Sequence, residues 1–113
     1  METNLAYEQA NVLKALGHPT RLQIVAELLN GTKCVTDMED ILPASQANIS
    51  QHLAVLRHAN IVDFAQDGAL RCYYLSRPEL IEGVMKLLAA DTPATRKTKE
   101  QINREKGKSD FSR

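Results

Sequence analysis

The sequence predicts a mainly α-helical domain that carries one small β-hairpin, and three observations predict it. Apolar side chains recur every three or four residues over residues 5–29, 49–56 and 80–88. Two β-prone runs, 61–66 and 70–75, flank an Asp-Gly pair, which is a strong signal of a tight hairpin turn. The chain has 113 residues, of which 25% are charged and 43% hydrophobic. This size and composition are typical of one small domain.

The first two helices are predicted from apolar spacing and from the residues at their ends. The first helix includes the apolar residues of 5–16 and ends at Gly17, a residue suited to the left-handed turn beyond a helix. The second begins at His18-Pro19, where a proline in the first turn costs no hydrogen bond, and it ends at Gly31. We expect His18 to be a helix-entry residue that hydrogen-bonds its own backbone.

A bridge strand and a short helix are expected next. Residues 33–35 are too few for anything longer than a bridge strand. Thr36 is expected to cap a short helix from Asp37 to about Leu42, because an acidic first residue suits the helix dipole. Pro43 ends this helix.

The segment after Pro43 is predicted to form an amphipathic helix over residues 46–58, with Ser45 as its N-cap. No Asp, Glu, Lys or Arg lies between Ser45 and Arg57, so the outward face is polar and almost uncharged. The inward stripe has aliphatic residues at i, i+4 and i+7: Ile49, Leu53 and Leu56.

The hairpin is expected to turn at Asp67 and Gly68, so that Gln66 pairs with Ala69. Counting back from the turn gives three further pairs: Phe64 with Arg71, Val62 with Tyr73 and Asp63 with Cys72. The same count predicts one buried face, formed by Val62, Phe64, Tyr73 and Leu75.

A last helix is predicted to begin near Pro78, with an apolar stripe that a body this small can hardly cover alone. A partner helix from a second copy is therefore implied. Beyond Ala90 the chain has too few large apolar residues to offset the entropy of ordering, so we expect disorder, or at most a fraying helix. Residues 91–113 contain seven basic and four acidic residues, a net charge of +3, which leaves −3 for the rest of a neutral chain.

Several classes of protein are not expected. Two cysteines are too few for a secreted disulfide scaffold, and the N-terminus lacks a signal-peptide pattern, so a cytoplasmic protein is the expectation. No apolar run approaches the roughly 20 residues that span a bilayer. No Gly-rich phosphate loop or credible nucleophile arrangement is present, so the chain is not expected to be an enzyme.

The order of elements predicts a helix-turn-helix, in which the second helix enters the major groove of DNA. Amide side chains can make paired contacts with adenine, and the Ala47 methyl can meet a thymine methyl. A helix face that only meets solvent is the alternative, but such faces normally carry Glu and Lys. The candidate DNA contacts are Ser45, Gln46, Ala47, Asn48, Ser50, Gln51 and His52, with Arg71 of the hairpin. For His52 we favour a phosphate contact over a bracing role within the fold.

Four stretches resemble the ArsR/SmtB family of bacterial winged helix-turn-helix repressors: LKALGHPTRLQIVAELL, CVTDMEDIL, SQANISQHLAVLRHANIV and DGALRCYYLS. The resemblance covers about residues 10–90, and SQANISQHLAVLR is its most specific motif. It implies a homodimer built on the first and last helices, a palindromic DNA operator, and release by an inducer. We therefore expect a DNA-binding and dimerisation domain over residues 1–90 and a basic tail over 91–113. The candidate interface residues are Leu5, Val12, Leu80, Val84, Leu87 and Leu88.

The chain departs from the family pattern at the wing and at the metal sites. Ala69 stands where members often carry a basic residue, which leaves Arg71 as the only cation of the hairpin. Arsenic-sensing members resemble CVTDME, but only Cys34 matches, since Thr36 and Glu39 stand near the second and third thiolate positions. The last helix has no histidine for the zinc or nickel site of other members.

The two cysteines form the candidate sensor. In winged folds of this kind the short strand lies beside the second wing strand, which would bring Cys34 near Cys72. Neighbouring, partly exposed thiols can form a reversible disulfide, a persulfide bridge or a soft-metal site, although small hydrophobes filling gaps are the alternative. The predicted function is an ArsR-type repressor released through thiol chemistry at this pair. The alternatives are a repressor that responds to arsenic or a soft metal at a non-standard site, and a winged-helix adaptor that binds protein instead of DNA.

Overall fold

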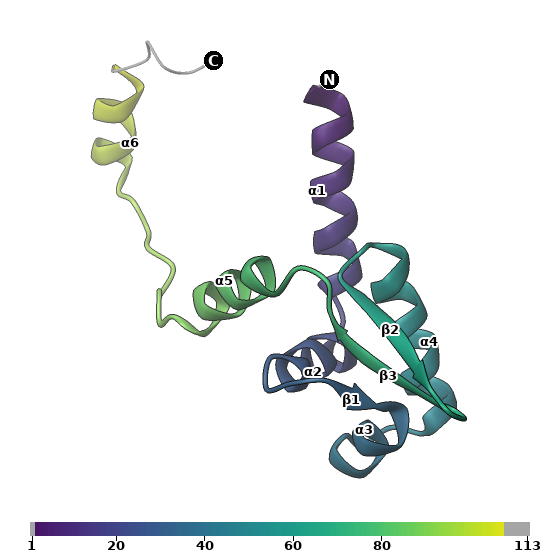
Figure 1. Cartoon of the computed structure of the whole chain (residues 1–113). Helices are drawn as coiled ribbons and strands as arrows, with labels where there is room; N and C mark the ends of the chain where they lie inside the picture. Colours follow the sequence, from purple (N-terminus) through teal and green to yellow (C-terminus); the bar gives the residue numbers. More distant parts are fainter. Residues whose placement is uncertain (1, 108–113) are drawn as a thin grey trace.

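A computed structural model describes residues 2–107 of the chain (Figure 1). The helices are α1 (Glu2–Leu16), α2 (Pro19–Leu28), α3 (Val35–Ile41), α4 (Gln46–His58), α5 (Pro78–Ala89) and α6 (Lys99–Lys106). The strands are β1 (Lys33–Cys34), β2 (Val62–Asp67) and β3 (Leu70–Leu75). They form one antiparallel sheet in the order β1-β3-β2. The predicted fold class, mainly α with one hairpin, is confirmed. Within residues 2–107, no helix is both long and apolar enough to cross a membrane.

The core forms where α2, α3 and α4 pack against the sheet. The predicted inward stripe of α4, Ile49, Leu53 and Leu56, is completely buried. Ile24 and Val25 of α2, together with Met38 of α3, are buried in the same cluster. The apolar spacing of the sequence therefore predicted the buried side of α4 correctly.

Two helix starts are fixed by side-chain caps that the sequence predicted. The backbone N–H of Thr20 donates a hydrogen bond of 3.0 Å to Nδ1 of His18, which confirms His18 as the entry residue of α2. Ser45 is the N-cap of α4, because its Oγ accepts a 3.2 Å hydrogen bond from the N–H of Asn48.

The start of α3 differs from the prediction. The helix begins at Val35, two residues before Asp37, and its N-cap is Cys34 rather than Thr36. The reason is a side-chain contact, since Oδ2 of Asp37 accepts a 3.0 Å hydrogen bond from the N–H of Cys34. The chain therefore passes from β1 into α3 without a connecting loop.

The predicted hairpin register was wrong, because the turn lies one residue later in the chain than expected. The loop residues are Gly68 and Ala69, and Asp67 pairs with Leu70. Gly68 has a φ of 64°, whereas Ala69 is not among the positive-φ residues of 2–107, and this pattern matches a turn with glycine at its first central position. The pairs that replace the predicted ones include Phe64 with Tyr73, Val62 with Leu75, Gln66 with Arg71, Asp63 with Tyr74 and Ala65 with Cys72.

The face prediction is nevertheless confirmed, because this register change moves each partner by two residues and keeps it on the same side of the sheet. Val62 and Tyr73 are buried, and Phe64 and Leu75 are half-buried against the core.

The C-terminal segment holds a helix where disorder was the main expectation. Oγ1 of Thr98 accepts a hydrogen bond of 3.1 Å from the N–H of Gln101, and Oε1 of Gln101 accepts one of 2.8 Å from the N–H of Thr98. This reciprocal capping box offsets part of the entropy of starting α6. Figure 1 shows α6 standing apart from the other helices, and none of its residues is buried. Residues 91–98 of the predicted disordered tail form no helix or strand, and residues 108–113 lie outside the described residues.

Candidate nucleic-acid interface

The polar face of α4 is presented by the helix-turn-helix formed by α3, the turn at Pro43 and α4. The stripe of buried aliphatic residues points into the core, so the other side of α4 must face outward. Most of the predicted DNA contacts are exposed: Ser45, Gln46, Ala47, Asn48, Ser50, Gln51 and Arg71. His52 alone among them is half-buried.

A groove of about 330 Å³ joins α4 to the wing formed by β2 and β3. Gln46, Ser50 and Arg57 line it from α4, while Gln66 and Arg71 line it from the wing. The structure thus brings three predicted residues, Gln46, Ser50 and Arg71, into one concave surface. Arg57 and Gln66, which the sequence analysis did not name as candidate contacts, line the same surface.

Two guanidinium groups are held in this groove by one aromatic ring. The Cζ atoms of Arg57 and Arg71 each lie 4.5 Å from the ring centroid of Phe64, within the range of a cation–π contact. Nε of Arg57 also donates a 3.0 Å hydrogen bond to Oδ1 of Asp63. The Phe64 N–H, followed by Arg57, lowers the pKa of the Asp63 carboxyl. Among residues 2–107 Arg71 makes no ion pair, so its charge remains available to an external anion.

His52 connects three helices from the inner edge of α4. Its ring centroid lies 4.4 Å from that of His18, and Nδ1 lies 3.2 Å from Nη1 of Arg21. Nε of Arg21 donates a further hydrogen bond to the carbonyl of Ala15, at the end of α1. Of the two roles considered for His52, these contacts match the bracing one. A phosphate contact by His52 stays a prediction.

Acidification is expected to destabilise the protein through His52. Burial, then the charges of His18 and Arg21, lower the pKa of His52 below its ordinary value of 6.5. The unfolded chain therefore binds the proton more readily than the folded one. The contribution of neutral His52 to the free energy of unfolding is complete above about pH 6.5, and it is lost as the pH falls through the lowered pKa. We expect the Tm of His52→Gln, measured by circular dichroism between pH 7.5 and 5.5, to fall less than that of the wild type. His58→Gln, at the exposed end of α4, is the control and should follow the wild type; identical curves for His52→Gln and wild type would contradict this role.

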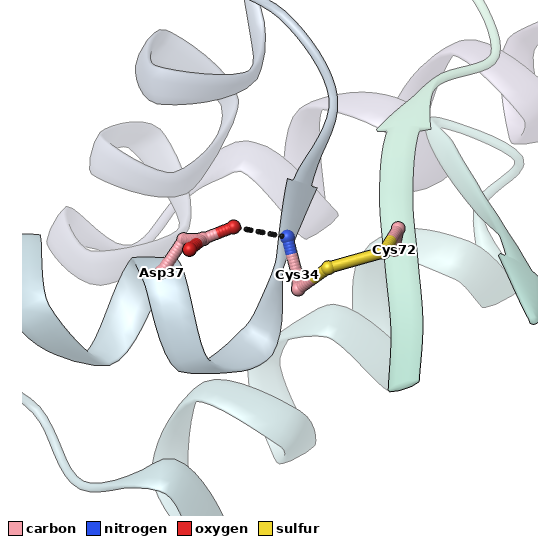
Figure 2. The surroundings of a disulfide bond; sticks show 3 residues. All are labelled: Cys34, Asp37 and Cys72. Carbon is pink, nitrogen blue, oxygen red and sulfur yellow. Dashed lines mark hydrogen bonds between the residues drawn. A yellow bond between two sulfur atoms is a disulfide. The ribbon is translucent and has the colours of Figure 1, made fainter. Parts of the chain in front are cut away.

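The two cysteines lie side by side, as the winged arrangement suggested. Cys34 pairs with Cys72 across β1 and β3, their Cα atoms are 3.9 Å apart, and their sulfur atoms form a disulfide (Figure 2). In this form neither sulfur is a thiolate ligand. Within the described part of the chain, no group of three or more His, Cys, Asp or Glu side chains is placed to hold a metal ion. A sensor role of the pair stays a prediction.

Helices α1 and α5, the latter being the predicted last helix, share an apolar groove of about 450 Å³. Four of the predicted interface residues line it: Leu5, Val12, Leu80 and Val84. The other two, Leu87 and Leu88, lie further along α5 and have exposed fractions of 77% and 64%.

A short helix, a tight turn, an amphipathic helix with an uncharged polar face and a two-stranded wing together define a winged helix-turn-helix DNA-binding domain. Residues 18–63 match the family described as bacterial regulatory protein, arsR family. The chain belongs to this ArsR family of DNA-binding transcriptional regulators, and its named relatives are described as transcriptional regulators.

Similar proteins support this assignment along most of the domain. An uncharacterized HTH-type transcriptional regulator of Methanocaldococcus jannaschii is 42% identical over 71 residues, which cover 61% of this chain and 80% of that protein. The transcriptional repressor PagR of Bacillus anthracis is 37% identical over 82 residues, or 72% of this chain and 81% of PagR. The solved structure of HlyU from Vibrio cholerae has a TM-score of 0.70 and 32% identity, and the match covers 80% of this chain and 100% of that one.

Proposed function

We propose that this chain is a homodimeric repressor that reads a palindromic operator in double-stranded DNA with α4 and releases it when an inducer acts. The observation that carries the proposal is the groove in which the uncharged polar face of α4 meets the wing and its two fixed arginines. Short hydroxyl and amide side chains suit base edges, and guanidinium groups suit phosphates. The proposal assigns the chain no catalytic role.

Each side chain of the interface has a proposed task. Gln46 and Ser50 contact base edges, because both are exposed and line the groove. The Ala47 methyl meets a thymine methyl, and Asn48 and Gln51 add polar contacts to bases or phosphates. Arg71 and Arg57 contact phosphates beside the major groove. Ser45 contributes mainly by capping α4, and His52 by holding α4 against α2.

The proposed dimer uses α1 and α5. The groove between these helices and the exposed Leu87 and Leu88 form an apolar surface of the kind that monomers seldom leave open. A second copy covers this surface and places two α4 helices about one turn of DNA, roughly 34 Å, apart. We set the end of this domain at residue 90, and the basic segment 91–113 lies outside it.

The salt dependence of binding tests the proposal. The affinity of the full chain for a labelled duplex from its own promoter region, measured by fluorescence anisotropy, should fall linearly with salt on logarithmic axes, by about 0.9 per neutralised phosphate. Arg71→Gln should therefore reduce the slope by about two in a dimer, one phosphate for each copy. The control is Lys14→Gln, in the last turn of α1 and outside the wing groove, which should leave the slope unchanged. A chain that binds no duplex at any salt concentration would instead be a protein-binding adaptor.

A further inference from the structure

The Cys34–Cys72 disulfide closes a loop that contains most of the proposed DNA-reading surface. The two cysteines are 38 residues apart, and the chain between them forms α3, α4, β2 and the turn into β3. Figure 2 shows the bond joining the segment that leads into α3 to the neighbouring strand. The reading helix therefore lies inside a covalently closed loop.

Two other kinds of contact join the ends of this loop: the pairing of β1 with β3, and the packing of α3 against β3 in the core. β1 pairs with β3 through two residue pairs, Lys33 with Tyr73 and Cys34 with Cys72. Strands of this length contribute little stability by themselves. The disulfide adds a covalent link between the start of α3 and the wing to this pairing and to the core packing of Met38 and Tyr73.

The pair is also open to small reagents. Both cysteines are half-buried, and Ala65, which pairs with Cys72, is exposed. Cys72 alternates along β3 with Tyr73, which points into the core, so Cys72 is on the outer face of the sheet. Arg71, the cation of the wing, is the next residue along the same strand.

We propose that Cys34 and Cys72 form a reversible disulfide that sets operator affinity, and that its reduction by a small thiol or hydrosulfide is the releasing signal. This inference rests on the operator binding proposed above. In the disulfide form the wing is already ordered relative to α3 and α4, so binding DNA costs less conformational entropy. Reduction removes this covalent link, so that β3 is held to the start of α3 only by the two strand pairs and by core packing, and the segment that carries Arg71 becomes freer.

The reaction balances as ordinary thiol–disulfide exchange. A thiolate attacks one cysteine sulfur, forms a mixed disulfide and expels the other cysteine as a thiolate. A second thiolate then attacks the mixed disulfide, releases the small disulfide and leaves the second cysteine reduced, so two thiolates have supplied two electrons. A hydroperoxide restores the bond: one cysteine thiolate takes its terminal oxygen to give a sulfenic acid and an alcohol, and the other cysteine displaces that oxygen as water.

The test compares the two forms of the wild-type chain. Chain oxidised with a hydroperoxide and chain reduced with hydrosulfide are each titrated, under anaerobic conditions, into the labelled promoter duplex. The oxidised form should bind the duplex at least about five-fold more tightly than the reduced form. Its Tm should be higher by roughly 10 °C. Cys34→Ser and Cys72→Ser should each bind like the reduced wild type and respond to neither reagent.

The outcomes separate this inference from the proposed function. Equal affinity of the two wild-type forms, or tighter binding by the reduced form, would overturn the switch while leaving operator binding intact. Absence of duplex binding by both forms would overturn the proposed function and the switch with it. Because the decisive comparison uses the wild-type chain, it does not depend on whether the serine variants fold.

Discussion

Leu88→Asp is expected to separate the two copies and to remove specific operator binding. Leu88 has an exposed fraction of 64% in the single chain, so the substitution should leave the fold of each copy intact. In the proposed dimer the same position is covered, and an unpaired carboxylate there carries a large desolvation cost. A single α4 reads only half of a palindrome, so affinity should fall to the level of non-specific binding, a loss of roughly 10³-fold or more.

Sedimentation equilibrium gives the mass of the Leu88→Asp chain, and fluorescence anisotropy gives its affinity for the promoter duplex. Leu88→Met, which keeps an apolar side chain of similar size, is the matched control and should remain dimeric. Circular dichroism should show the same helix content for both variants. A Leu88→Asp chain that remains dimeric would refute the proposed α1–α5 dimer, and a monomer that still binds the operator specifically would refute reading by a symmetric pair.

Gln46→Ala and Ser50→Ala are expected to reduce discrimination between base pairs without unfolding the chain. Both side chains are exposed and line the groove beside the wing. Each lost base contact should cost about 1–3 kcal/mol at particular positions of the operator and little at the others.

Anisotropy titrations against a set of duplexes, each with one operator base pair changed, measure this discrimination. Gln23→Ala removes an exposed amide from α2, outside the groove, and should leave the whole profile unchanged. If Gln46→Ala and Ser50→Ala weakened binding to every duplex equally, the two side chains would have no role in reading sequence.

Much of the fold could be predicted because apolar spacing records which side of each helix is buried. Ile49, Leu53 and Leu56 illustrate this, since all three are completely buried. The start of α3 could not be predicted in the same way, because it depends on the Asp37 carboxylate accepting the Cys34 N–H. The hairpin register could not be predicted from the alternation of apolar residues either. The expected register and the observed one bury the same faces, and they differ only in the position of Gly68 in the turn.

The site was only partly visible in the sequence for a similar reason. The uncharged surface of α4 follows from the residue types alone, and continuing the helical spacing from Gln46 and Ser50 would have found Arg57. Gln66 enters the groove only when the true register is known. The contact between His52 and Arg21 joins residues 31 positions apart and leaves no local signal.

One titration tests most directly whether paired α4 helices read DNA. The wild-type chain is titrated at one salt concentration into the palindromic duplex of its promoter and into a scrambled duplex of identical composition, with the stoichiometry measured in parallel. Two chains should bind each palindrome, with an affinity roughly 10³-fold or more above that for the scrambled duplex. Equal affinities for the two duplexes, or one chain bound to each palindrome, would contradict reading by a symmetric pair.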